Sequence, residues 1–481
     1  MITSADLIAL SPLVVLAAGA SLILLVIAFY RSHQLTFGLT LLTLALALLA
    51  LWLAAPVLPR PVTVLLIFDR YAAFFLGLLF AASFVVTLLA YGYWARRPGT
   101  PEEFYMLLLV ATLGASVLVT SRHFVSFFLG LELLSVALYV LIAYARTSAH
   151  SVEAGIKYLV LAAVAAAFLL FGMALVYAAL GTMDLAGMVA VLVNPGAMLN
   201  PLLLTGLALI IIGIGFKLAV VPFHMWTPDI YQGAPAPVTA FVATVSKGGM
   251  LALLLRIFVP MDMLRTSTLV LVFALIAAAS MLVGNWLALL QNNVKRILAY
   301  SSIAHLGYML VAFLTGGAVA VAAVSYYLVA YIATTLGAFG VVIVLSGADG
   351  EAEALEEYRG LFWRRPWLAA VFTASLLSLA GIPLTAGFVG KFFILAAGVG
   401  SALWWLVVIL VVGSVIGLFY YLRIIITMMA PLPEPASLTV APVLPLAGGI
   451  ALAAVTLAVV WLGIYPSPFL QLIQSTVATL L

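Results

Sequence analysis

Four ionisable side chains lie inside apolar runs long enough to cross a membrane: Glu132, Lys217, Lys247 and Lys391. A charge at the centre of a bilayer costs roughly 3 kcal/mol, so charged residues at this depth usually have a function. Carboxylates and amines can each hold and release a proton. A row of them therefore predicts a path for protons or other ions.

Glutamate and lysine can exchange protons when their surroundings change. Loss of water disfavours the charged form of each group, whereas a neighbouring opposite charge favours it. A Glu–Lys pair therefore titrates as a coupled unit. Changing the proton affinity of one group about 100-fold supplies roughly 2.7 kcal/mol, and moving one charge against 100 mV takes about 2.3 kcal/mol. The two quantities match.

The composition indicates an integral membrane protein whose driving energy comes from elsewhere. Of 481 residues, 67% are hydrophobic and 7% are charged, whereas soluble domains carry roughly 25% charged residues. The chain has no cysteine, which excludes disulfides and thiolate-bound iron–sulfur clusters. Its histidines show no metal-ligand spacing, and it has no nucleotide-binding loop and no basic cluster for nucleic acid. We expect no metal or cofactor here, and a driving force from an ion gradient or a partner subunit.

About fourteen apolar runs are long enough to form membrane-spanning helices, which predicts an all-α polytopic membrane protein. The runs occupy residues 7–29, 35–55, 72–93, 104–120, 124–145, 155–180, 201–222, 235–258, 266–289, 296–315, 321–346, 366–395, 402–428 and 440–465. Two further titratable residues, Lys157 and His305, lie within these runs and are secondary candidates for the relay. Other basic residues, Arg256 and the Lys295–Arg296 pair among them, are expected to be helix-end charges.

The seventh and twelfth runs, 201–222 and 366–395, are predicted to be discontinuous helices. Lys217 lies shortly before Pro222, and Lys391 lies shortly after Pro383, in both cases amid glycines. Proline removes a backbone donor and leaves a carbonyl without its helical partner. At membrane depth this carbonyl must be satisfied by protein or water, so each break predicts a polar pocket beside a lysine.

A weak internal repeat relates two parts of the chain at an offset of 169 residues. Residues 137–144 resemble 306–313, and 157–160 align with 326–329. The repeat would relate the fourth to eighth runs to the ninth to thirteenth, as inverted five-helix halves of the kind found in transporters. We therefore expect an N-terminal three-helix segment, two half-channel repeats and a C-terminal helix, over residues 1–100, 101–260, 261–430 and 431–481.

The basic residues predict the orientation of the chain. Ten of them lie in the odd-numbered loops and five in the even-numbered loops, which places the odd loops in the cytoplasm and both termini in the periplasm. The acidic segment 349–357 falls in one of the cytoplasmic loops. It is either a solvated loop or a surface for a partner.

Three segments, 128–135, 217–229 and 295–307, resemble the antiporter-like membrane subunits of complex I, the proton-pumping NADH:quinone oxidoreductase. The resemblance extends over essentially all fourteen runs. Within this family, residues 229–241 and 243–247 are similar to the N-subunit group, the counterpart of mitochondrial subunit 2. The lysine at position 391 agrees, because the M-subunit group carries a glutamate there.

The resemblance implies a role for each matching position. Glu132 would modulate Lys217, Lys247 would connect the two halves, and Lys391 would be the terminal proton donor. Lys157 and His305 would be secondary relay positions.

The resemblance also implies where the chain works and with which partners. It would be a translocase subunit in the inner membrane of a bacterium, embedded in the bilayer beside neighbouring antiporter-like and small membrane-arm subunits. NADH, FMN, iron–sulfur clusters and quinone would be bound by partner subunits. Two alternatives stay open: a subunit of a multisubunit cation/proton antiporter, and a structural module that only holds the membrane arm together.

Overall fold

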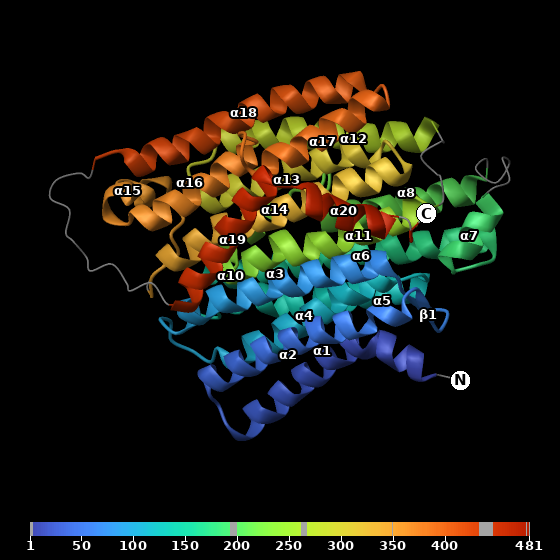
Figure 1. The fold of residues 1–481 in the computed structure, drawn as a ribbon, viewed down its shortest axis with the longest axis horizontal. Helices are drawn as coiled ribbons and strands as arrows, with labels where there is room; N and C mark the ends of the chain where they lie inside the picture. The colour runs from blue at the N-terminus through green and yellow to red at the C-terminus, as the bar shows by residue number, and fades with distance from the viewer. Residues whose placement is uncertain are drawn as a thin grey trace.

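The computed structural model describes residues 3–192, 200–260, 267–348, 350–431, 446–477 and 479–480. Figure 1 shows a bundle of long helices that lie side by side, with α1 and α2 along one edge and α18 along the other. Both ends of the chain lie at the same end of this bundle, and α15 lies at the opposite end (Figure 1). This arrangement agrees with an even number of membrane crossings.

Thirteen helical segments in the described residues are long and apolar enough to cross a membrane. They are α1 (Ser4–Phe29), α2 (His33–Ala54), α3 (Arg70–Trp94), α4 (Glu102–Thr120), α5 (Phe124–Ile142), α6 (Ala149–Leu180), α8 (Pro201–Leu218), the continuous run of α10 (Ala236–Phe241), η3 (Val242–Ser246) and α11 (Lys247–Phe258), α12 (Ser267–Leu289), α13 (Val294–Phe313), α14 (Gly317–Leu345), α18 (Trp404–Met429) and α19 (Leu446–Ile464).

Two shorter apolar helices, α16 (Pro366–Ala380) and α17 (Ala386–Gly400), form the twelfth predicted run. Each has 15 residues, too few to span a membrane singly. With this pair the described part of the chain contains the fourteen runs predicted, and the all-α polytopic fold is confirmed. The remaining elements are short: η1 (Ala55–Val57), β1 (Arg60–Val62), β2 (Leu66–Phe68), α7 (Leu185–Leu192), α9 (Trp226–Gly233), η5 (Leu355–Tyr358), α15 (Leu361–Arg364) and α20 (Ser467–Val477).

Both predicted helix breaks are present. Helix α8 ends at Leu218, Ala219 adopts a left-handed conformation (φ 61°), and the chain passes Pro222 before α9 begins. The indole nitrogen of Trp226 donates to the carbonyl of Phe216 at 2.9 Å. A carbonyl near the end of α8 is therefore satisfied by protein, as a helix end in lipid requires.

Helix α10 is irregular in a way that the sequence analysis did not predict. It is separated from α9 by two residues, and it continues into the π-helical turn η3, which ends immediately before Lys247. Single π-helical turns are rare and are found frequently at functional sites.

Two pairs of helices approach each other closely at a glycine. A Cβ on Gly114 of α4 would lie 2.4 Å from the nitrogen of Leu134 on α5, and a Cβ on Gly284 of α12 would lie 2.7 Å from the nitrogen of Ala304 on α13. Both residues of the second contact follow those of the first by 170 positions. This spacing is one residue more than the offset seen in the sequence.

Replacing Gly114 by alanine should destabilise the protein, because the new methyl group would meet backbone atoms that cannot rotate away. We expect a loss of about 1–3 kcal/mol, the usual cost of overpacking. The matched control is Gly38→Ala on α2, where a Cβ would have open space and alanine is the better helix former. Thermal denaturation in detergent should show a lower midpoint for the first variant only. Equal midpoints would contradict this explanation of the contact.

Candidate functional site

The three lysines predicted to be functional are all buried, with exposed fractions of 5% for Lys217, 1% for Lys247 and 7% for Lys391. Each ammonium group donates to a serine hydroxyl and also lies about 5 Å from the centre of a tyrosine ring. The serine and tyrosine are Ser135 (2.8 Å) and Tyr158 (5.1 Å) for Lys217, Ser302 (2.6 Å) and Tyr231 (5.3 Å) for Lys247, and Ser414 (2.6 Å) and Tyr308 (5.3 Å) for Lys391.

This shared environment suits a group that changes its charge. The face of an aromatic ring attracts a cation. A serine hydroxyl can accept a hydrogen bond from an ammonium group or, after rotation, donate one to a neutral amine. Each pocket can therefore hold its lysine in either protonation state.

Lys217 occupies the last turn of α8, directly before the helix break. Its ammonium group reaches two other helices, because Ser135 lies on α5 and the Tyr158 hydroxyl on α6 accepts a second hydrogen bond at 2.9 Å. From the last turn of α8 its side chain thus lies between α5 and α6, inside the bundle.

Glu132 lies on α5, one turn before Ser135 and on the same face of that helix. Among the ion pairs of the described residues, none joins Glu132 to Lys217 within 4 Å. One carboxylate oxygen of Glu132 is buried without a hydrogen-bond partner in this part of the chain. The two charges can therefore act on each other only across a gap.

Lys391 provides a hydrogen bond to a backbone carbonyl at the helix break beside it. Its ammonium group donates to the carbonyl of Ala380, the last residue of α16, at 2.8 Å. Gly381, between that residue and Pro383, has a φ of 85° and lies against the lysine side chain. A Cβ there would come 2.7 Å from Cδ of Lys391. The glycine thus gives the lysine access to the freed carbonyl.

A polar row begins at Lys247 and continues along α13. Lys247 donates to Ser302, which shares a hydrogen bond with the Tyr331 hydroxyl of α14 at 2.7 Å. The ring of Tyr331 lies 5.6 Å from that of His305. Two hydrogen bonds therefore connect the middle lysine to Tyr331, and a ring contact connects Tyr331 to the histidine.

His305 continues this row towards Lys391. Its ring nitrogens contact the hydroxyl groups of Tyr327 at 2.7 Å and Tyr421 at 3.2 Å. Its ring also packs edge to face on Tyr308, the residue over which Lys391 lies. The predicted positions Lys247, His305 and Lys391 are thus joined by tyrosines and serines that the sequence analysis did not single out. The available sequence signal for these tyrosines and serines was the presence of their hydroxyl groups within long apolar helices.

Lys157 lies outside this buried row. Its side chain is 44% exposed and forms ion pairs with Glu153 at 2.7 Å and Asp229 at 3.1 Å, and Asp229 also pairs with Arg296. In the described part of the chain we find no group of three or more side chains that could hold a metal ion.

Two basic residues predicted to be helix-end charges do lie near helix ends, but both are buried. Arg256 is 6% exposed and pairs with Asp69, and Lys295 is fully buried and pairs with Glu351. In both cases the partner lies far away in the sequence, so the run that contains the basic residue does not reveal its burial.

Comparison with known proteins identifies the family. The family model described as NADH:quinone oxidoreductase/Mrp antiporter, transmembrane, matches residues 121–417. NADH-quinone oxidoreductase subunit N from Nitrosospira multiformis is 53% identical over 485 residues, which cover 98% of this chain and 96% of the relative.

Solved structures share the fold over nearly the whole chain. A chain of respiratory complex I from Thermus thermophilus is 35% identical with a TM-score of 0.81, covering 96% of this chain and 98% of its own length. A chain of the Mrp complex from a Dietzia species has a TM-score of 0.86 over 99% of this chain and 97% of its own, but is 21% identical, which shows the common fold alone. The chain belongs to the NADH:quinone oxidoreductase/Mrp antiporter family and, within it, to the subunit N group of NADH-quinone oxidoreductase.

Proposed function

We propose that this chain is a proton-translocating membrane-arm subunit of complex I, the NADH:quinone oxidoreductase of a bacterial inner membrane. The observation that carries the proposal is the repeated pocket of serine, tyrosine and buried lysine, which supports both protonation states of the amine. Quinone reduction in partner subunits drives the transfer, and this chain contributes no redox group. Its partners are the other membrane-arm subunits.

Protons are relayed in a defined order. Glu132 modulates the charge of Lys217, Lys247 connects the two halves, and Lys391 delivers the proton at the far end. His305 joins the last two lysines through its tyrosine neighbours. Lys157, in its exposed ion-pair cluster, takes part only at the margin of the relay.

Two inverted five-helix halves build the relay, with boundaries at about residues 101–260 and 261–430 between the segments 1–100 and 431–481. The packing order supports this division. Helix α4 packs on α5, α5 on α6 and α6 on α8, and in the same order α12 packs on α13, α13 on α14 and α14 on both α16 and α17. The close contacts at Gly114 and Gly284, 170 positions apart, also support this division.

The orientation follows from charge. The odd-numbered loops hold most of the basic residues and are cytoplasmic, so both termini are periplasmic. Both chain ends lie at the same end of the bundle in Figure 1, which supports placing the two termini on one side of the membrane. The 53% identity to a subunit N favours complex I over a separate cation/proton antiporter.

Neutralising Lys217 or Glu132 in the complete complex should reduce NADH-driven proton pumping. In Lys217→Met we expect a fall of roughly 10-fold or more, because the amine itself binds the proton. In Glu132→Gln we expect a smaller fall, since this carboxylate acts across a gap. Acidification inside inverted membrane vesicles measures pumping, and immunoblotting of the purified complex verifies assembly.

The other two functions predict different results. A purely structural module predicts normal pumping in both variants, and that outcome would remove the transport function. A separate antiporter predicts that the chain exchanges cations in vesicles that lack the remaining NADH dehydrogenase subunits.

A further inference from the structure

A helix break between α9 and α10 lies beside the pocket of Lys247. Helix α9 ends at Gly233 and α10 begins at Ala236. In a continuous helix the amide of Ala236 would donate to the carbonyl of Gln232, four residues earlier. Here the two backbone groups are separated, and each needs another partner.

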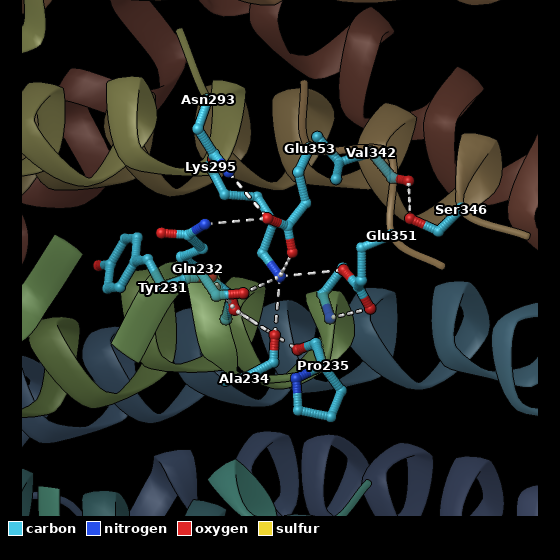
Figure 2. Close-up of polar contacts among 12 residues, drawn as sticks. Tyr231, Gln232, Ala234, Pro235, Asn293, Lys295, Val342, Ser346, Glu351 and Glu353 are labelled. Carbon is cyan, nitrogen blue, oxygen red and sulfur yellow. Dashed lines mark hydrogen bonds and ion pairs between the residues drawn. The ribbon is translucent and has the colours of Figure 1, made fainter. Parts of the chain in front are cut away.

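Lys295 and Glu351 supply these partners (Figure 2). The ammonium group of Lys295 donates to the carbonyls of Gln232 at 2.9 Å and Ala234 at 2.8 Å, and to one carboxylate oxygen of Glu351 at 3.0 Å. The other carboxylate oxygen of Glu351 accepts from the amide of Ala236 at 3.3 Å. All three ammonium hydrogens are used, and Lys295 is fully buried.

We propose that Lys295 and Glu351 form a salt bridge inserted into the backbone hydrogen-bond ladder, and that they are positioning residues for the proton relay at Lys247. The pair connects the carbonyl of Gln232 to the amide of Ala236, which would bond directly in an unbroken helix. This inference rests on the proposed function. The relay requires both residues, but neither of them carries the proton.

The pair acts on Lys247 through Tyr231 and α13. Tyr231 directly precedes Gln232, and its hydroxyl lies 3.5 Å from that of Ser302, the hydrogen-bond partner of Lys247. Lys295 and Ser302 lie on the same helix, two turns apart. Fixing the end of α9 against Lys295 therefore fixes Tyr231 against Ser302 and Lys247.

The segment that carries Glu351 is held firmly. Glu351 also contacts the hydroxyl of Tyr93, in the last turn of α3, and lies 3.4 Å from the guanidinium group of Arg97, which follows that helix. The carbonyl of Glu353 accepts from the amide of Val294 at 2.7 Å.

The side chain of Glu353 adds further contacts, because its carboxylate accepts from Gln232 at 3.2 Å and from Asn293 at 2.8 Å. The described part of this acidic segment, which excludes Asp349, is thus folded against the chain. It borders a cavity of about 640 Å³, so Glu351 is partly solvated while Lys295 is not.

The two ends of the bridge have different hydrogen-bonding requirements. The residue at 295 must donate to two carbonyls, and the residue at 351 must accept from an amide. A simple salt bridge tolerates exchange of its two partners, whereas in this bridge an exchanged carboxylate would face two carbonyl oxygens with no hydrogen to donate. Recovery of function in the exchanged pair would therefore exclude this bridge.

The test uses the complete complex in lipid vesicles and measures protons pumped per NADH oxidised, with hydrogen–deuterium exchange of the peptide containing Ala236. In Lys295→Met we expect pumping to fall about 10-fold through loss of positioning. The Ala236 amide should exchange up to about five-fold faster, because its acceptor Glu351 would lose the ammonium group that holds it. Lys295→Arg, which still donates, should retain more of both. The double variant Lys295→Glu/Glu351→Lys should resemble Lys295→Met.

The matched control is Glu356→Gln, which removes one charge from the same segment where the side chain is 78% exposed, and it should pump normally. If Lys295→Met does not assemble, Glu351→Gln takes its place and should show the same changes to a smaller extent. Normal pumping in the assembled variant, or recovery in the exchanged pair, would overturn the inference. Normal pumping in Lys247→Met would instead overturn the proposed function, whatever the exchange rate at Ala236.

Discussion

Replacing Lys247 by methionine should nearly abolish NADH-driven proton pumping, with a loss of roughly 100-fold. Lys247 is 1% exposed, and its ammonium group donates to Ser302 at 2.6 Å. It starts the polar row that reaches His305 and Lys391. Methionine is also long and flexible and carries no charge, so it removes the proton site without the cost of burying an ion. The complex should therefore assemble in normal amounts.

The control for this variant is Ser302→Ala, which keeps the lysine and removes the hydrogen bonds of this hydroxyl, one of them to Lys247. Loss of about 1 kcal/mol would slow transfer about five-fold, well short of the loss expected for Lys247→Met. Proton uptake by vesicles, normalised to NADH oxidation, distinguishes the two variants. If both variants lose pumping equally, the hydroxyl and not the amine limits transfer, and the role assigned to Lys247 is wrong.

The parts of the site that were predicted from sequence are those with a local signal. A charge in an apolar run is visible without knowledge of the fold, as for Lys217 and Lys391. A proline close to such a charge also predicts a break, because its backbone chemistry acts on its own helix. For these reasons the buried lysines and the discontinuous helices were both predicted correctly.

The partners of the lysines depend on contacts between helices and could not be predicted in this way. Ser135 and Tyr158 lie far from Lys217 in sequence, and a hydroxyl in an apolar helix can equally bond its own backbone. The burial of Lys295 has the same origin, since it requires the segment around Glu351 to fold back over the break. A single amino-acid sequence does not show which distant residues contact each other in the fold.

Removing the carboxylate of Asp69 should cause the largest loss of stability, roughly 3–5 kcal/mol. Asp69 is 1% exposed and bonds both terminal nitrogens of Arg256, at 2.8 and 3.0 Å. It also accepts from the amide of Ala72 at 2.6 Å as the N-cap of α3. Asp69→Ala would leave a buried guanidinium group without its counter-ion and the helix without its cap.

The effect should extend to three helices, because Arg256 lies in the last turn of α11 and Asp69 caps α3. The Arg256 side chain also donates to the carbonyl of Val119 near the end of α4 at 3.0 Å. We expect Asp69→Ala to lower the thermal midpoint of the purified complex and the amount of subunit incorporated.

A double variant, Asp69→Asn/Arg256→Met, tests the reason for that loss. Removing both charges of a buried pair costs far less than removing one, and asparagine keeps the N-cap. The double variant should therefore recover most of the stability that Asp69→Ala loses. If it is as unstable as Asp69→Ala, the contacts of the arginine chain with its neighbours, and not the unpaired charge, hold these three helix ends together. Recovery of stability, together with unchanged pumping per assembled complex, would assign the pair a structural role. That role would be separate from the relay of Lys217, Lys247 and Lys391.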